Sequence, residues 1–236
     1  MTGPALAMLL ALAVLLMPVG YLFVAVWSAN TASAGVVETE RAAVAFGRPL
    51  NNLMAMLVDA RTTAVQKITI EDSGITAAVK QINLIDRDIA ERLGTDQRWA
   101  ELDTEITNTL NNAASGSDAL AAYATPIRLT QAMLDWIAES ALARPDPGGS
   151  AHLLDVALHQ LPQSIAAAGE LAAAATSGDD RVATQFQLAV SQDRVRVLAE
   201  QVAATLRTAN EHESSAPFAA GLNILTPLDT FAAAAN

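Results

Sequence analysis

The chain has 236 residues, a formal net charge of −11, no cysteine, and a composition that is 52% hydrophobic but only 4% aromatic. The acidic balance argues against nucleic-acid binding, because phosphate contacts need clustered Lys and Arg. The absence of cysteine excludes a disulfide framework, a thiol nucleophile and a thiolate metal site. Much of the apolar content is alanine, which favours closely packed helices over a sheet, so the composition predicts an all-α protein.

The first predicted element is a membrane-spanning helix at residues 5–27. This stretch contains no charged residue and no histidine, and as a helix it would reach roughly 34 Å, enough to cross a hydrocarbon core of about 30 Å. We therefore expect residues 1–30 to be a single-pass anchor and residues 31–236 to form one extracytoplasmic domain. A cleaved signal peptide is the alternative, since Ala32-Ser33-Ala34 before Gly35 has the small-x-small pattern of a signal-peptidase site.

A long helix is predicted next, at residues 36–70, from apolar residues spaced three or four apart. Its apolar stripe consists of Val44, Leu50, Leu53, Leu57 and Val65. The positions expected to be polar are Glu38, Glu40, Arg41 and Arg61. Pro49 predicts a kink or a local start within this helix, because proline lacks a backbone donor.

The remaining predicted helices are separated by residues that end or begin helices. A second helix at residues 75–93 stops at Gly94, and Thr95 is the N-cap of a third at residues 96–113. The last four are predicted at residues 118–144, at residues 150–176, from the stretch 177–180 onward through Leu206 and, with a weaker pattern, at residues 215–235. Short turns between amphipathic helices predict an elongated up-and-down bundle, either four-helix-bundle-like or two stacked bundles.

Three polar residues share one face of the predicted helix at residues 150–176. His152, Asp155 and His159 lie at i, i+3 and i+7. The two imidazoles would be roughly 10 Å apart along a straight helix, so they cannot both bind one ion. One His with Asp155 could bind a metal only with ligands from another helix. Otherwise these are solvated or hydrogen-bonded positions, and we predict no metal and no cofactor.

Arg41, Arg48 and Arg61 are the cations of most interest in this acidic chain. A guanidinium buried between helices could bind a carboxylate or a similar small anion in a bidentate manner. The alternative is that these arginines are exposed or pair with an acid of a neighbouring helix. We find no phosphate-binding glycine loop, no G-x-S-x-G and no H-E-x-x-H in the sequence, and we therefore predict that the protein is not an enzyme.

The run from Glu40 to Leu50, ERAAVAFGRPL, resembles the opening of the extracytoplasmic helical sensor regions of bacterial histidine kinases, diguanylate cyclases and chemoreceptors. Those regions have a pattern similar to E-R-x-G-x-x-Y-x-R-P-L. Three later segments resemble the family in the same order: Ile85-Asp86 to Trp99 and Leu102, Ser140-Ala141-Leu142 with Asp146-Pro147, and Leu154-Asp155 with Leu161-Pro162. The resemblance covers roughly residues 36–175. The chain departs from it at Ala43, Phe46 and Gly47.

The resemblance implies a sensor domain at the bacterial cell membrane that binds a small ligand or a protein partner and passes a helix shift through the membrane. It also implies a homodimer. No second apolar span and no cytoplasmic output module is found in the sequence, so we expect either part of a longer transducer or a stand-alone relative. The alternative function is a non-enzymatic structural or adaptor subunit that docks on a larger membrane protein complex.

Overall fold

The computed structural model describes residues 37–68, 73–85, 87–112, 114–142, 150–176 and 182–212, and every regular element within these ranges is a helix. The prediction of an all-α protein is confirmed for this part of the chain. None of the described helices is both long enough and apolar enough to cross a membrane. The predicted anchor at residues 5–27 and the predicted last helix at residues 215–235 lie outside the described ranges.

The described helices follow the predicted order. They are α2 (Val37–Val65), α3 (Ser73–Asn83), α4 (Arg87–Leu93), α5 (Asp96–Asn112), α6 (Ser117–Leu142), α7 (Ser150–Asp155), the π-helical turn η1 (Val156–Gln160), α8 (Leu161–Thr176) and α9 (Val182–His212). The segments α7, η1 and α8 follow one another without interruption, so they form the single long helix predicted at residues 150–176.

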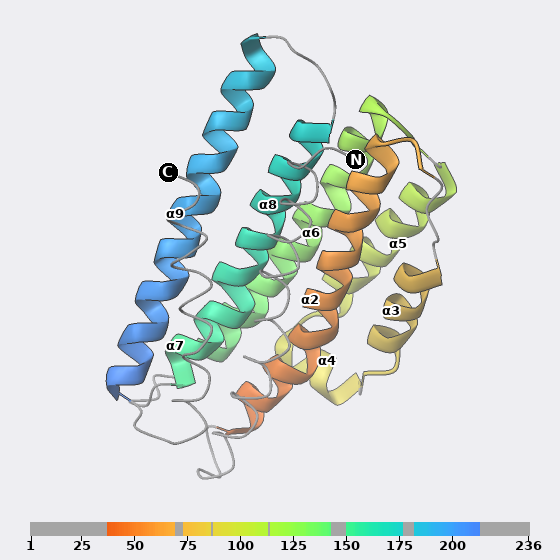
Figure 1. The fold of residues 1–236 in the computed structure, drawn as a ribbon. Coiled ribbons are helices and arrows are strands. Elements are labelled where there is room, and N and C mark those ends of the chain that lie inside the picture. The colour runs from red at the N-terminus through yellow and green to blue at the C-terminus, as the bar shows by residue number, and fades with distance from the viewer. Residues whose placement is uncertain are drawn as a thin grey trace.

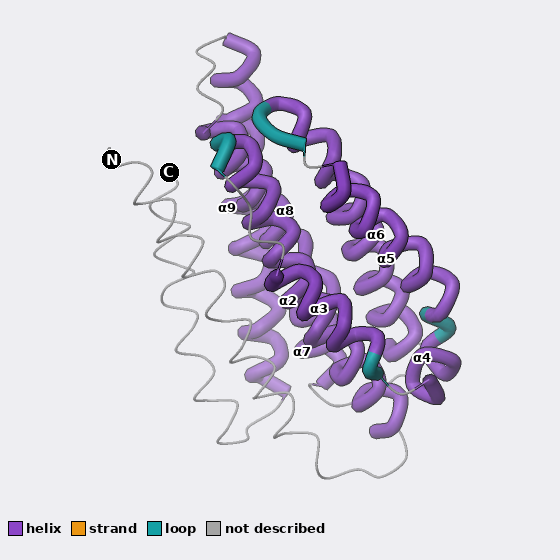
Figure 2. Tube along the Cα trace, turned by 90° about the vertical axis from the view of Figure 1, so that its right-hand side faces the viewer, coloured by secondary structure: helices purple, strands orange, loops and turns teal. Residues whose placement is uncertain are grey.

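The long helices lie side by side along one axis and alternate in direction (Figures 1 and 2). In the view of Figure 1, α2 runs upward, α6 downward, the α7–α8 helix upward and α9 downward. α2 packs against α6, α8, α3 and α4, whereas α9 packs against α8, η1 and α7. The described part is therefore one up-and-down bundle with α2 near its centre, and not two bundles stacked end to end.

The apolar stripe predicted for α2 is buried. Val44, Leu50, Leu53, Leu57 and Val65 are all part of the main hydrophobic core. Glu40 and Arg61, which were expected at polar positions, are buried as well, at 3% and 5% exposed. The prediction of polar positions for these two residues was wrong because both continue the buried stripe: Glu40 lies four residues before Val44, and Arg61 lies four residues after Leu57.

The helix predicted at residues 75–93 is divided into α3 and α4. The break falls at Leu84 and Ile85, where the Ile85 N–H donates to the Ile82 carbonyl at 3.0 Å in a tight turn. Asn83, a poor helix former, ends α3, and its side chain accepts a hydrogen bond from Trp99 Nε1 at 2.7 Å. This contact with α5 stabilises the break, which the regular spacing of apolar residues did not reveal.

Gly94 ends α4 in the manner that the sequence predicts. Its φ is +62°, in the left-handed region that glycine adopts without strain. The Thr95 N–H donates to the Ala90 carbonyl and the Gly94 N–H donates to the Glu91 carbonyl, which is the Schellman pattern of a helix C-terminus. After this turn α5 runs in the direction opposite to α3 (Figure 1).

Candidate functional site

The structure separates the three arginines of interest. Arg41 and Arg48 are exposed on α2, whereas Arg61 is only 5% exposed, near the other end of the same helix. Thirteen residues of helix between Arg48 and Arg61 correspond to about 20 Å. One small ligand therefore cannot contact all three side chains, and Arg61 alone has the burial that an interhelical anion site requires.

The Arg61 guanidinium is buried without enough hydrogen-bond partners. Its Nε and Nη2 atoms are both inaccessible to solvent and neither has a hydrogen-bond acceptor. Burial lowers the pKa of Arg61 from its ordinary value, while the nearby Glu170 carboxylate raises it. Buried polar groups in proteins are almost always paired, so two buried N–H groups without a protein acceptor make Arg61 the candidate anion-binding residue of α2.

Gly169 of α8 allows this side chain to lie between α2 and α8. A Cβ added to Gly169 would lie 3.0 Å from Arg61 Nη2 and would overlap Val58 Cγ1. The absence of a side chain at this position therefore lets the α8 backbone approach the guanidinium and Val58 of α2. The guanidinium therefore lies between the apolar side chain of Val58 on α2 and the backbone of Gly169 on α8.

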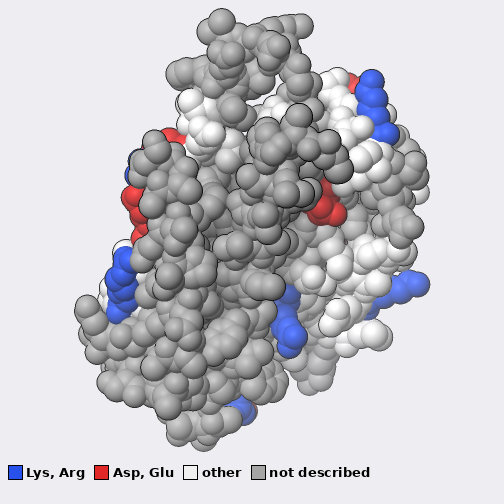
Figure 3. Space-filling model, in the orientation of Figure 1, with Lys and Arg blue, Asp and Glu red and all other residues white. Residues whose placement is uncertain are grey.

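The acid whose charge acts on Arg61 is Glu170, which follows Gly169 on α8. Glu170 forms an ion pair with Arg194 of α9 at 3.2 Å, and both side chains are about half exposed. Acidic and basic side chains lie next to one another along the side of the molecule on which α9 runs (Figure 3). Glu170 thus contacts a cation on α9 while its charge also acts on Arg61.

The position of Arg61 in the sequence predicts that it is buried, although its charge suggests an exposed side chain. Arg61 lies four residues after Leu57 and four before Val65, so it continues the buried stripe of α2. Arg41 and Arg48 are seven residues apart on the opposite stripe. An arginine in register with leucine and valine is the feature that identifies the site.

A second group of polar residues surrounds the π-helical turn. Directly after η1 the Leu161 N–H donates to the Val156 carbonyl, five residues earlier. In that register the donor to the Ala157 carbonyl would be residue 162, but Pro162 has no N–H. Asn51 of α2 replaces it, since its Nδ2 donates to the Ala157 carbonyl at 3.0 Å in the buried interior. The donor that Pro162 lacks is therefore replaced through a π turn and a side chain from another helix.

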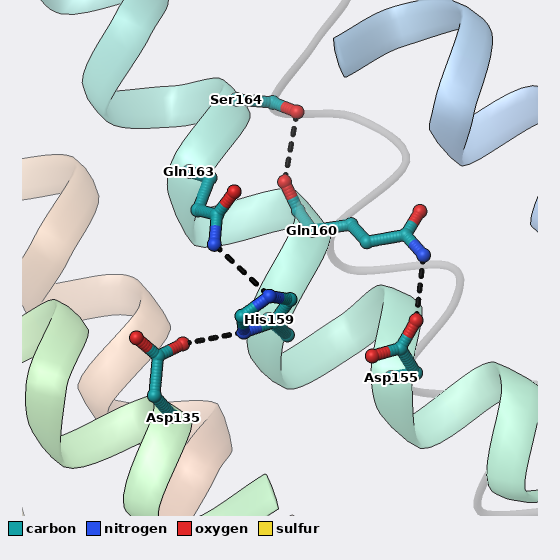
Figure 4. A network of polar contacts seen from close by, with 6 residues as sticks. All are labelled: Asp135, Asp155, His159, Gln160, Gln163 and Ser164. Atoms are coloured by element: carbon teal, nitrogen blue, oxygen red, sulfur yellow. Dashed lines mark hydrogen bonds and ion pairs between the residues drawn. The ribbon is translucent and has the colours of Figure 1, made fainter.

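His159 and Gln160 of η1 point in opposite directions (Figure 4). His159 Nδ1 lies 2.7 Å from an Asp135 carboxylate oxygen on α6, and its Nε2 lies 3.1 Å from Gln163. Gln160 Nε2 donates to Asp155 at 2.6 Å and to Thr205 of α9 at 2.9 Å. These contacts tie the turn to both α6 and α9.

The three candidate metal ligands do not converge. Asp155 accepts a hydrogen bond from Gln160, and His159 is paired with Asp135. His152 is half-buried one turn before Asp155 on the same helix. Among the described residues there is no cluster of three His, Cys, Asp or Glu side chains that could hold a metal ion. The sequence analysis did not identify Asn51 and Gln160 as important polar residues, because their partners lie on helices distant in the sequence.

No protein-family model, curated protein or solved structure matches this chain.

Proposed function

We propose that this protein is a membrane-anchored sensor domain of bacterial signal transduction that binds a small anion at Arg61, between α2 and α8. The observation that carries the proposal is the buried guanidinium with two N–H groups that lack an acceptor. Removing one partner from a buried ion pair typically costs about 3–5 kcal/mol. A bound anion would supply the missing charge and the missing acceptors together.

The two Arg61 nitrogens without a hydrogen-bond acceptor, Nε and Nη2, indicate which class of ligand fits the site. Nε–H and one N–H of Nη2 point from the same edge of a guanidinium, nearly parallel to each other. The two oxygens of a carboxylate match this edge in a bidentate arrangement. A small monocarboxylate therefore suits the site better than a spherical halide, which accepts from a single point, or a dianion, whose second charge would stay uncompensated.

A signal requires that the ligand distinguish two arrangements of the helices. A ligand shifts an equilibrium only by the difference between its affinities for the two states. An anion at Arg61 would contact α2 on one side and the α8 backbone at Gly169 on the other, so its binding depends on how these helices pack. α2 follows the predicted anchor in the chain, and a shift of α2 is the route we propose to the membrane, in a homodimer or a larger complex.

Isothermal titration of the full chain in a mild detergent tests this function. We expect formate or acetate to give binding heat and to raise the thermal midpoint, relative to sodium chloride and sodium sulfate at equal ionic strength. R61Q should abolish the response, because the bidentate edge is lost. R48Q is the matched control, since Arg48 lies exposed on the same helix, and it should respond like the unaltered chain.

The outcome that contradicts the sensor function is equally specific. If no anion gives heat or a shifted midpoint, or if R61Q responds as the unaltered chain does, then Arg61 is not a ligand site.

An adaptor subunit is the second candidate function. Val190 and Val197 are exposed at 52% and 45%, one above the other seven residues apart on α9. Such side chains could contact a membrane protein complex without any small ligand. A stoichiometric partner retained equally by the unaltered chain and by R61Q, together with no response to anions, would favour this candidate.

A further inference from the structure

One carboxylate in the bundle lies close to two competing cations. Glu170 directly follows Gly169, the residue whose backbone lies against the Arg61 guanidinium. Its side chain is directed to Arg194 of α9, with an N–O distance of 3.2 Å. Glu170 is also the carboxylate whose charge acts on the buried Arg61 guanidinium, while its ion pair with Arg194 holds it toward α9.

We infer that Arg194 keeps the Arg61 site open by holding the Glu170 carboxylate on α9, so that ligand binding at α2 depends on an ion pair between α8 and α9. This inference rests on the proposed function. Arg194 is a positioning residue, because it acts on the site only through Glu170.

The competition follows from the environments of the two cations. Arg194 is more than half exposed and its pairing with Glu170 is screened by water. Arg61 is buried with no acceptor on Nε or Nη2, so its attraction for a carboxylate is screened far less. If Arg194 is removed, Glu170 loses its present partner and is drawn to Arg61. The free edge would then be filled from within the protein.

The inference predicts that a residue on the protein surface controls binding at a buried site. R194Q in the full chain should weaken acetate binding on the order of tenfold, measured by titration in detergent against chloride of equal ionic strength. The double variant E170Q/R194Q should restore it, because glutamine carries no charge to compete with the ligand. R196Q is the matched control, since Arg196 pairs with Asp193 and Glu200 within α9, and it should bind as the unaltered chain does.

The possible results are distinguishable. Loss in R194Q with recovery in E170Q/R194Q supports the inference, and a purely structural role of Arg194 would not give that recovery. Unchanged binding in R194Q overturns the inference but leaves the sensor function intact. Absence of acetate binding in all four chains, including E170Q/R194Q, overturns the sensor function and the inference together.

Discussion

Arg61 places a positive charge on the side of α2 where every neighbouring position of the stripe is apolar. Leu57 is fully buried and Val65 is 9% exposed, so the guanidinium replaces what would otherwise be another aliphatic side chain. Transfer of an uncompensated charge into such surroundings is costly. An anion bound to Arg61 would compensate this buried charge, so ligand binding should produce a large increase in stability.

The first stability prediction concerns this cost. R61M should raise the free energy of unfolding of the ligand-free protein by about 1–4 kcal/mol, because methionine fills a similar volume without a charge to desolvate. Urea unfolding in buffer without carboxylates measures the change. R48M, at an exposed position of the same helix, should lie within about 0.5 kcal/mol of the unaltered chain. A decrease in stability for R61M would mean that Arg61 has a strong partner in solution.

At the scale of the element, the α7–α8 helix is continuous only because another helix completes its hydrogen bonding. The π turn moves the unused acceptor to Ala157, and Asn51 of α2 supplies the donor. Gly47, one turn earlier on α2, contributes to the same approach, because a Cβ there would overlap Leu158. The contact fixes the register between α2 and the π turn.

A double-mutant cycle tests this account of the π turn. N51L should destabilise the protein by about 1–3 kcal/mol, because it leaves the buried Ala157 carbonyl without a donor. In a P162A background residue 162 regains its N–H, which can donate to that carbonyl, so the same N51L change should cost at least about 1 kcal/mol less. N52L, at the exposed neighbouring position, is the control. Additive effects of N51L and P162A would show that the two residues do not share one carbonyl.

The same elements show how far the sequence predicts this structure. Helical spacing alone identified the long helices and the buried leucines of α2, and Gly94 identified the end of α4, because these features depend on local geometry. The division between α3 and α4 depends on Asn83 meeting Trp99, and the π turn depends on Asn51, which lies 106 residues from Ala157. Contacts between distant segments leave no periodic signal, so the sequence could nominate Arg61 but not its unpaired edge.

At the scale of the whole molecule, the proposed function requires the bundle to be attached to a membrane by residues 1–30. The full chain should sediment with membranes and remain there after a high-salt wash, as expected for a spanning helix and not for a peripheral acidic protein.

Placing arginine at both Leu15 and Leu16 should move the chain to the soluble fraction, because each arginine at the centre of a span costs about 2.5–3.5 kcal/mol. Arg41 and Arg48 changed to glutamine would serve as the charge-altering control and should leave sedimentation unchanged. A mature N-terminus at Gly35, measured by intact mass, would contradict the anchor, because the bundle would then be released and a shift of α2 would have no membrane helix to move.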